Sequence, residues 1–179
     1  NHYKPCIFVV NKWDKLAGTM PTEKWVHYLH DTFRTMRYAP IAFITGQTGK
    51  NVKALLNHGQ MLFKQSRERI ATGQLNRMLR DAVRHNPPPM HRGRRPKIYY
   101  ATQVGVQPPT IVLFCNNPKA IAKPYQRYLL GVFRDELSFD EVPIKLYLRK
   151  REASDVRDEV DSQLTGPASE QVPASATKS

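Results

Sequence analysis

The sequence is poor in cysteine, and this limits how the protein can be stabilised. It contains only Cys6 and Cys115, each within an apolar run of strand length. A disulfide framework or a cysteine-ligated metal centre needs more cysteines at closer spacing. The two residues therefore predict reduced thiols in a hydrophobic core, in a protein of cytoplasmic location, and no metal site is expected.

Long hydrophobic runs are also lacking. No apolar run approaches the ~18 residues that a membrane-spanning helix needs. Residues 1–15 do not have the order of a secretory signal, which places a charged region before an apolar one. The sequence thus predicts no membrane span.

Acidic residues are scarce relative to basic ones. The chain has 28 Lys and Arg against 15 Asp and Glu, a net charge of +13. Residues 66–151 hold 17 of the basic residues and 6 of the acidic ones, whereas residues 152–179 hold 2 and 6. This excess favours a polyanionic partner, first of all nucleic acid. The last segment is rich in Ser, Ala, Pro and acids, so we predict a disordered acidic tail over 152–179.

The first 69 residues have the pattern of a parallel α/β unit. The runs "PCIFVV" and "APIAFITG" predict strands that are buried on both faces. Between them, a helix that begins at Pro21 or Thr22 is predicted from one apolar stripe: Trp25, Val26, Leu29 and Phe33. A second helix from about Asn51 to Arg69 is predicted to bury one face: Val52, Leu55, Leu56, Leu62 and Phe63.

The stretch "NKWD" follows the first of these strands. A carboxylate at Asp14 can accept two parallel hydrogen bonds, from the N1–H and the 2-amino group of guanine, and adenine offers no such pair. We expect Lys12 to lie over the base and Asn11 to tie the loop to its neighbours. The alternative is an ordinary polar turn in which Asp14 caps a helix.

A second loop, "TGQTGKNV", follows the second predicted strand. Here Thr45 and Gly46 are the candidate site residues, and the Gly46 backbone N–H is expected to reach the guanine O6. Since ligand sites in open α/β sheets lie outside the carboxyl ends of the strands, the two loops together favour binding of GTP or GDP.

The sequence lacks a phosphate-binding loop. "GQTGKN" carries Gly-Lys, but the G-x-x-x-x-G-K-[S/T] pattern needs glycine and a hydroxyl where the chain has Ile44 and Asn51. A D-x-x-G motif for magnesium is also missing. We therefore expect the chain to be a carboxyl-terminal piece of a longer GTPase, with no catalytic residue of its own and no hydrolysis by itself.

Residues 70–151 predict the element order α-β-β-α-β, the core of a KH-type module. The helix faces and the final strand are read from apolar periodicity, with Leu146 and Leu148 facing one way and Lys145, Tyr147 and Arg149 the other. RNA-binding KH domains clamp the backbone with a G-x-x-G loop, and the only such pattern here, Gly46 to Gly49, lies in the first segment. RNA binding in the KH manner is therefore not assumed.

Two groups of side chains could contact RNA directly. Four basic residues in one loop are candidates for phosphate contact, the alternative being a solvated charge run: Arg92, Arg94, Arg95 and Lys97. Four tyrosines could stack on bases, although aromatic residues on strands and amphipathic helices favour a core role: Tyr99, Tyr100, Tyr128 and Tyr147.

Taken together, "NKWDK", "APIAFITGQTGKNV", "LNRMLRDAV" and "GRRPKIYYATQVGVQPPTIVLFCNNP" resemble the bacterial double-GTPase family called Der or EngA. The resemblance implies a chain with repeated GTPase domains, in which residues 1–69 end the second one and residues 70–151 form the KH-like domain. It also implies a role in biogenesis of the large ribosomal subunit.

The partners implied are the large ribosomal subunit with its rRNA and the amino-terminal GTPase domains of the same polypeptide. Mg²⁺ is implied only for the intact protein. The family usually has Ser-Ala where this chain has Thr45-Gly46. The alternative function is a stand-alone basic RNA-binding module with a vestigial nucleotide fold.

Overall fold

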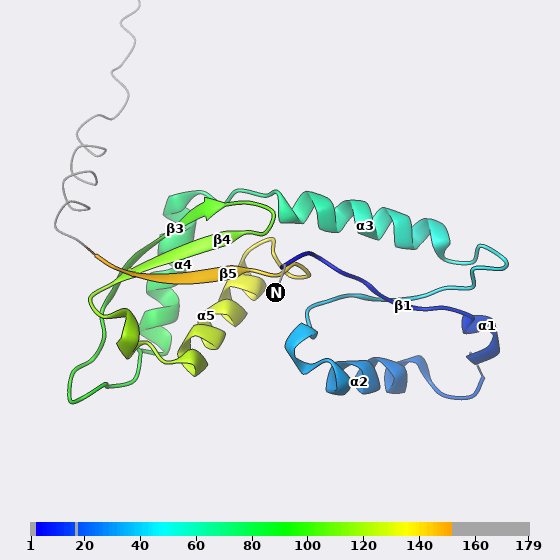
Figure 1. Cartoon of the computed structure of the whole chain (residues 1–179), viewed down its shortest axis with the longest axis horizontal. Coiled ribbons are helices and arrows are strands. Elements are labelled where there is room, and N and C mark those ends of the chain that lie inside the picture. The colour runs from blue at the N-terminus through cyan, green and yellow to red at the C-terminus, as the bar shows by residue number, and fades with distance from the viewer. Residues whose placement is uncertain (1–2, 17, 152–179) are drawn as a thin grey trace, which may run out of the picture.

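The computed structural model describes residues 3–16 and 18–151 (Figure 1). An amino-terminal unit, residues 3–66, contains β1 (Phe8–Val10), α1 (Trp13–Leu16), α2 (Thr22–Thr32), β2 (Ile41–Phe43) and α3 (Val52–Ser66). A carboxyl-terminal unit, residues 72–151, contains α4 (Thr72–His85), β3 (Ile98–Gly105), β4 (Thr110–Cys115), α5 (Lys123–Glu136) and β5 (Lys145–Lys150). The predicted acidic tail lies outside the described residues.

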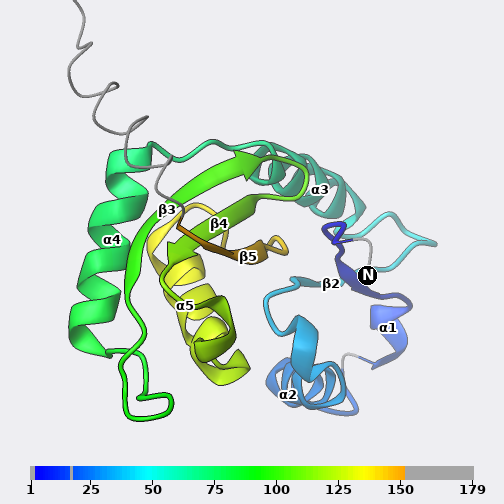
Figure 2. The same cartoon turned by 60° about the vertical axis from the view of Figure 1, so that its left-hand side comes forward.

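The carboxyl-terminal unit is a three-stranded sheet with two helices on one side. β4 is the central strand, antiparallel to β3 and parallel to β5. Figure 1 and Figure 2 show α4 and α5 on the same side of this sheet, and their side chains share one buried cluster with alternate residues of the strands. The predicted α-β-β-α-β order is confirmed, and the mixed α/β fold class with it.

The helices of this unit bury the faces that their periodicity predicts. In α4, Leu75, Leu79 and Ala82 are buried at the i, i+4, i+7 spacing of a helical stripe. α4 ends just before three prolines, which cannot continue a helix. In α5, Pro124 lies in the first turn, where its missing N–H costs nothing, and Leu129 and Phe133 face the core.

The amino-terminal unit has a smaller, more open sheet. β1 and β2 pair in parallel, with Val10 opposite Phe43. The prediction that the first strand is buried on both faces is wrong for the described residues, because Val9 is 44% exposed. Within residues 3–16 and 18–151 this sheet has two strands, so the side chains of β1 are covered incompletely.

The predicted burial of α3 also needs correction. Leu62 and Ser66 are buried, but Leu56 and Phe63, which were expected on the same face, are 63% and 56% exposed. The apolar arc of this helix is wider than the surface against which the described chain packs it. Periodicity identifies which side chains are apolar, and it does not identify how much surface is available to cover them.

Several contacts join the two units. Leu62 of α3 belongs to the buried cluster of the carboxyl-terminal unit, and the Gln107 N–H donates to the Ser66 carbonyl at 2.9 Å. The Gln103 carboxamide accepts from the Ile70 N–H at 2.8 Å and donates to the Glu68 carbonyl at 2.9 Å. The end of α3 is therefore fixed to the turn between β3 and β4, and the linker that follows is fixed to β3.

Both cysteines are free thiols, with Cys115 buried and Cys6 partly so. Burial raises the pKa of each thiol above its ordinary value. In the part of the chain that the structure describes, no helix is long and apolar enough to cross a membrane.

Candidate guanine-binding site

Two loops meet at the carboxyl edge of the β1–β2 pair. Because the strands are parallel, the segments that follow β1 and β2 leave the sheet at the same end. Hydrogen bonds between these two segments continue beyond the strands. The Ile44 N–H donates to the Val10 carbonyl at 2.9 Å, and the Trp13 N–H donates to the Ile44 carbonyl at 3.0 Å. The loop after β1 and the loop after β2 are thus held side by side.

Asn11 is the link between these loops. Its Oδ1 accepts hydrogen bonds from the Lys12 N–H at 2.7 Å and from the Gly46 N–H at 3.0 Å. The residue that was expected to tie the loop to its neighbours makes contacts of that kind, across 35 positions of sequence.

The Gly46 N–H is therefore already used within the protein. From the sequence, this group was expected to reach the guanine O6, whereas here it donates to Asn11. A Cβ at Gly46 would lie 3.4 Å from the Asn11 Oδ1, so the backbone approaches the carboxamide closely. Contact of this N–H with a base requires that it be shared with, or released by, the asparagine.

Thr45 and Asp14 form the second connection. Thr45 is 3% exposed, and its Oγ1 accepts from the Asp14 N–H at 3.3 Å. The Asp14 side chain lies in the first turn of α1 and is exposed to solvent. The neighbouring Trp13 ring packs on Phe43 of β2, with ring centroids 4.4 Å apart, which fixes the start of α1 against the sheet.

The loop backbone adopts conformations that only some residues tolerate. Lys12 and Asn51 have φ of 60° and 63°, and Gly49 has φ of 75°. Asn51 also donates from Nδ2 to the Phe43 carbonyl at 2.9 Å, closing the turn ahead of α3. From the sequence, Asn51 was predicted to lie at the start of a helix and to be a mismatch to a phosphate loop, with no anchoring role. Its tolerance of the left-handed region was the signal for an anchoring role.

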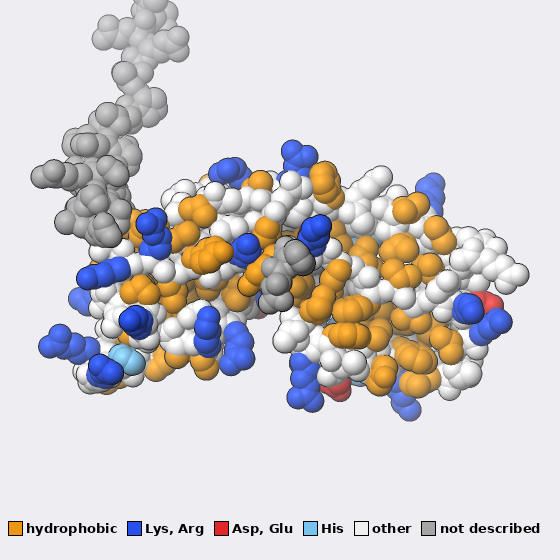
Figure 3. All heavy atoms as spheres, viewed as in Figure 1, with side chains coloured by type: hydrophobic (Ala, Val, Ile, Leu, Met, Phe, Trp, Pro, Cys, Tyr) orange, Lys and Arg blue, Asp and Glu red, His pale blue; other side chains and the backbone are white. Residues whose placement is uncertain are grey.

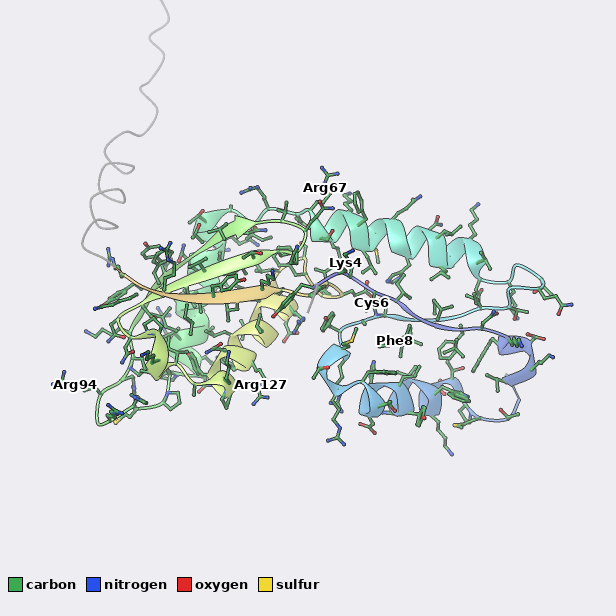
Figure 4. The ribbon with its side chains drawn as sticks, in the orientation of Figure 1. Lys4, Cys6, Phe8, Arg67, Arg94 and Arg127 are labelled. Atoms are coloured by element: carbon green, nitrogen blue, oxygen red, sulfur yellow. The ribbon has the colours of Figure 1, made fainter. Side chains whose placement is uncertain are left out.

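The predicted basic loop lies in the other unit, away from the loops that follow β1 and β2. Arg92 and Gly93 have φ of 50° and 72°, and His91 and Arg94 exchange two backbone hydrogen bonds, so residues 91–94 form a tight turn. Arg92, Arg94, Arg95 and Lys97 are exposed. Figure 4 shows Arg94 pointing away from the sheet. None of the four forms an ion pair with a described residue.

The fold and the two loops define a class of protein: a parallel α/β unit of the GTPase type joined to a KH-like domain. Residues 69–149 match the family described as KH-domain-like of EngA bacterial GTPase enzymes, C-terminal. Over these residues the chain is similar to the Der (EngA) family, and the similarity to proteins named GTPase Der extends beyond them.

Its relatives are similar over most of this chain. It is 59% identical over 162 residues to a GTPase Der from Rhodopirellula baltica, covering 90% of this chain and 36% of the relative. It is 44% identical over 152 residues to a GTPase Der from Syntrophobacter fumaroxidans, covering 83% of this chain and 34% of that protein. The chain thus spans about a third of the length of these relatives.

Proposed function

We propose that these residues are part of a GTP-binding protein of the Der type that acts in biogenesis of the large ribosomal subunit, with GTP hydrolysed by the intact polypeptide. The observation that carries the proposal is the Asn11 side chain bonded to the Gly46 backbone across the two loops. The 59% identity to a protein named GTPase Der supports it.

The loops contain the donors and acceptors that guanine requires. Asp14 supplies an exposed carboxylate for the N1–H and the 2-amino group, and Lys12 supplies an aliphatic stem and a charge beside it. GTP, when bound, brings the phosphate chain and the bond that is hydrolysed. This chain contributes base recognition, since the phosphate-loop pattern and a D-x-x-G motif are missing from its sequence.

The division of labour follows the two units. We assign guanine recognition to residues 1–69 and contact with rRNA to residues 70–151. In this proposal, the nucleotide state controls how the KH-like domain sits against its neighbours. The contacts between the two units, which include Leu62 and the Gln103 carboxamide, would transmit that control.

Asp14→Asn in the intact protein tests the guanine site. The substitution replaces one acceptor of the carboxylate fork by a donor, so GTP affinity should fall by on the order of 2 to 4 kcal/mol. Xanthosine triphosphate has a carbonyl where guanine has its amino group, so the variant should bind it better than the parent does. Isothermal titration calorimetry with both nucleotides measures the exchange of preference.

Glu23→Gln is the matched control, because it neutralises an exposed carboxylate in the first turn of α2 rather than of α1. It should bind GTP as the parent does. Equal GTP affinity in the Asp14→Asn variant and the parent would remove Asp14 from the site and, with it, the proposed mode of base recognition.

A further inference from the structure

The three-stranded sheet has one face that α4 and α5 do not cover. Register identifies its residues: Tyr100 lies opposite Phe114, and Phe114 lies opposite Arg149. Val112 lies between Thr102 and Tyr147 in the same way. Along β5, the residues of this face alternate with Leu146 and Leu148, which pack on the helix side, as the sequence predicts.

Aromatic rings dominate this face. Tyr100 and Phe114 stack at a centroid distance of 4.4 Å and an interplanar angle of 15°. Tyr147 is 51% exposed, and Tyr99, at an irregularity of β3, is 42% exposed. The interpretation of the strand tyrosines as core residues is therefore wrong for Tyr99 and Tyr147.

Basic side chains surround these rings. The Arg151 guanidinium lies 5.1 Å from the Tyr99 centroid and 5.8 Å from that of Tyr100. Arg149 is exposed, and Lys145 begins the same row of β5. β3, β4 and β5 contain no acidic residue. Figure 3 shows hydrophobic side chains over this part of the molecule with Lys and Arg side chains around them.

Aromatic rings interleaved with basic groups match unpaired nucleotides better than they match another protein. Each base offers a flat face that stacks on an exposed ring, and each phosphate offers a charge that Arg or Lys neutralises. A protein partner would need a surface both apolar and acidic to satisfy the same side chains.

We propose that this open sheet face binds single-stranded RNA, with a base stacked on Tyr147 and a phosphate held by Arg149. The site is distinct from the basic loop of residues 91–97. It deepens the proposed function, on which the choice of RNA as ligand rests.

The test uses the full chain and a fluorescein-labelled RNA of mixed sequence, about 12 nucleotides long. Fluorescence anisotropy gives the dissociation constant. Tyr147→Ala should weaken binding roughly tenfold, because one stacked base loses its platform. Tyr147→Phe keeps the ring and should bind nearly as the parent does. Tyr28→Ala removes a tyrosine that is 60% exposed on α2, and it should change nothing.

A salt series separates stacking from charge. Tyr147→Ala should leave the slope of log affinity against log salt unchanged, since no phosphate contact is lost. Arg149→Ala should reduce that slope by about 0.7, the value for one phosphate of a single strand. Melting curves check the fold of every variant, and Arg149→Ala keeps the inference falsifiable if Tyr147→Ala does not fold, since an unchanged slope in that variant would overturn it.

The results have separate meanings. Equal RNA affinity for Tyr147→Ala and Tyr28→Ala overturns the inference, as does equal affinity of the parent for duplex and single-stranded RNA. If another protein covers this sheet face instead, Tyr147→Ala and Tyr28→Ala should have equal RNA affinity. The proposed function is judged separately, by the response of nucleotide binding to Asp14→Asn, so either idea can fail alone.

Discussion

At the scale of single residues, Tyr125 shows how one polar group is accommodated in the core. It is 4% exposed, and its hydroxyl donates to the Asn86 carbonyl at 2.8 Å, just beyond the end of α4. Burial raises the pKa of this phenol from 10.0 to about 12. The hydrogen bond satisfies a carbonyl that the helix end would otherwise leave unpaired.

This shift predicts a loss of stability in alkali. Below pH 10 the phenol is protonated in both the folded and the unfolded chain, and between pH 10 and 12 only the unfolded chain ionises. The free energy of unfolding should therefore fall across this window, and Tyr125 should account for roughly 2 kcal/mol of the fall.

Urea unfolding of Tyr125→Phe and the parent at several pH values measures the difference. The variant should start less stable by about 1 kcal/mol, having lost the hydrogen bond, and should lose less on going to pH 12. Tyr28→Phe on the surface is the control. Parallel alkaline losses in Tyr125→Phe and the parent would contradict the assignment.

At the scale of elements, prediction from sequence depended on whether an element finds its partners within the described residues. The buried faces of α4 and α5 and the alternation along β5 were correctly predicted, because the two helices and three strands of this unit enclose one hydrophobic core. The exposure of Phe63 and Val9 was not predicted, because their burial depends on which neighbours pack on them, and apolar periodicity does not identify those neighbours. The sequence predicted that Asn11 ties its loop to its neighbours, but it did not predict that the Gly46 N–H is the group to which Asn11 binds.

The turn at residues 91–94 carries a prediction about phosphate contact. If Arg92, Arg94 and Arg95 bind phosphates, replacing all three by alanine should reduce the slope of log RNA affinity against log salt by roughly 2 to 3. The loss should be similar for unrelated RNA sequences, since phosphate contacts do not read bases. Anisotropy over a salt series measures it, with melting curves to confirm the fold.

A triple variant of α4 is the matched control for total charge. Arg77, Arg80 and Arg84 are exposed on that helix, and alanine there removes the same charge from another surface. An equal change of slope in both triple variants would mean that net charge, and not the turn, attracts RNA. An unchanged slope in the turn variant would leave these arginines as a solvated charge run.

Substitution by alanine should change the stability of the protein in opposite directions at Gly131 and Gly49. Gly131 lies within α5 with nothing within 4 Å of the added Cβ, so Gly131→Ala should stabilise the protein by about 0.5 to 1 kcal/mol. Gly49 has φ of +75°, and Gly49→Ala should destabilise it by about 1 kcal/mol or more. Urea midpoints report both signs, and stabilisation by Gly49→Ala would contradict the turn geometry.

At the scale of the whole molecule, the contacts between units are what sequence could not predict. His58 of α3 lies 2.8 Å from Glu141 near the start of β5, a pair 83 positions apart. The Arg134 guanidinium lies 4.3 Å from the Tyr38 ring centroid across the same junction. Neither pair follows a local period, so neither carries a signal in a single sequence.

The missing motifs predict how the chain behaves by itself. Most nucleotide affinity in P-loop GTPases comes from the phosphate cradle and magnesium, and neither pattern occurs in this sequence. The isolated chain should therefore bind GTP weakly at best and release phosphate no faster than buffer does. Calorimetry and a phosphate-release assay test this, and micromolar binding of GTP would contradict it.

Helix α3 begins beside the loop that follows β2, where Asn51 is bonded to β2, and the linker after its far end is held to β3 through Gln103. Its 15 residues span about 22 Å, at ~1.5 Å per residue. Pivoted at the Gln103 clamp, a rod of that length turns a swing of about 10° into a displacement of about 4 Å at the opposite end. In the proposed function, a movement of the loop that follows β2 by little more than an atomic diameter would thus accompany a change in the angle between α3 and the three-stranded sheet.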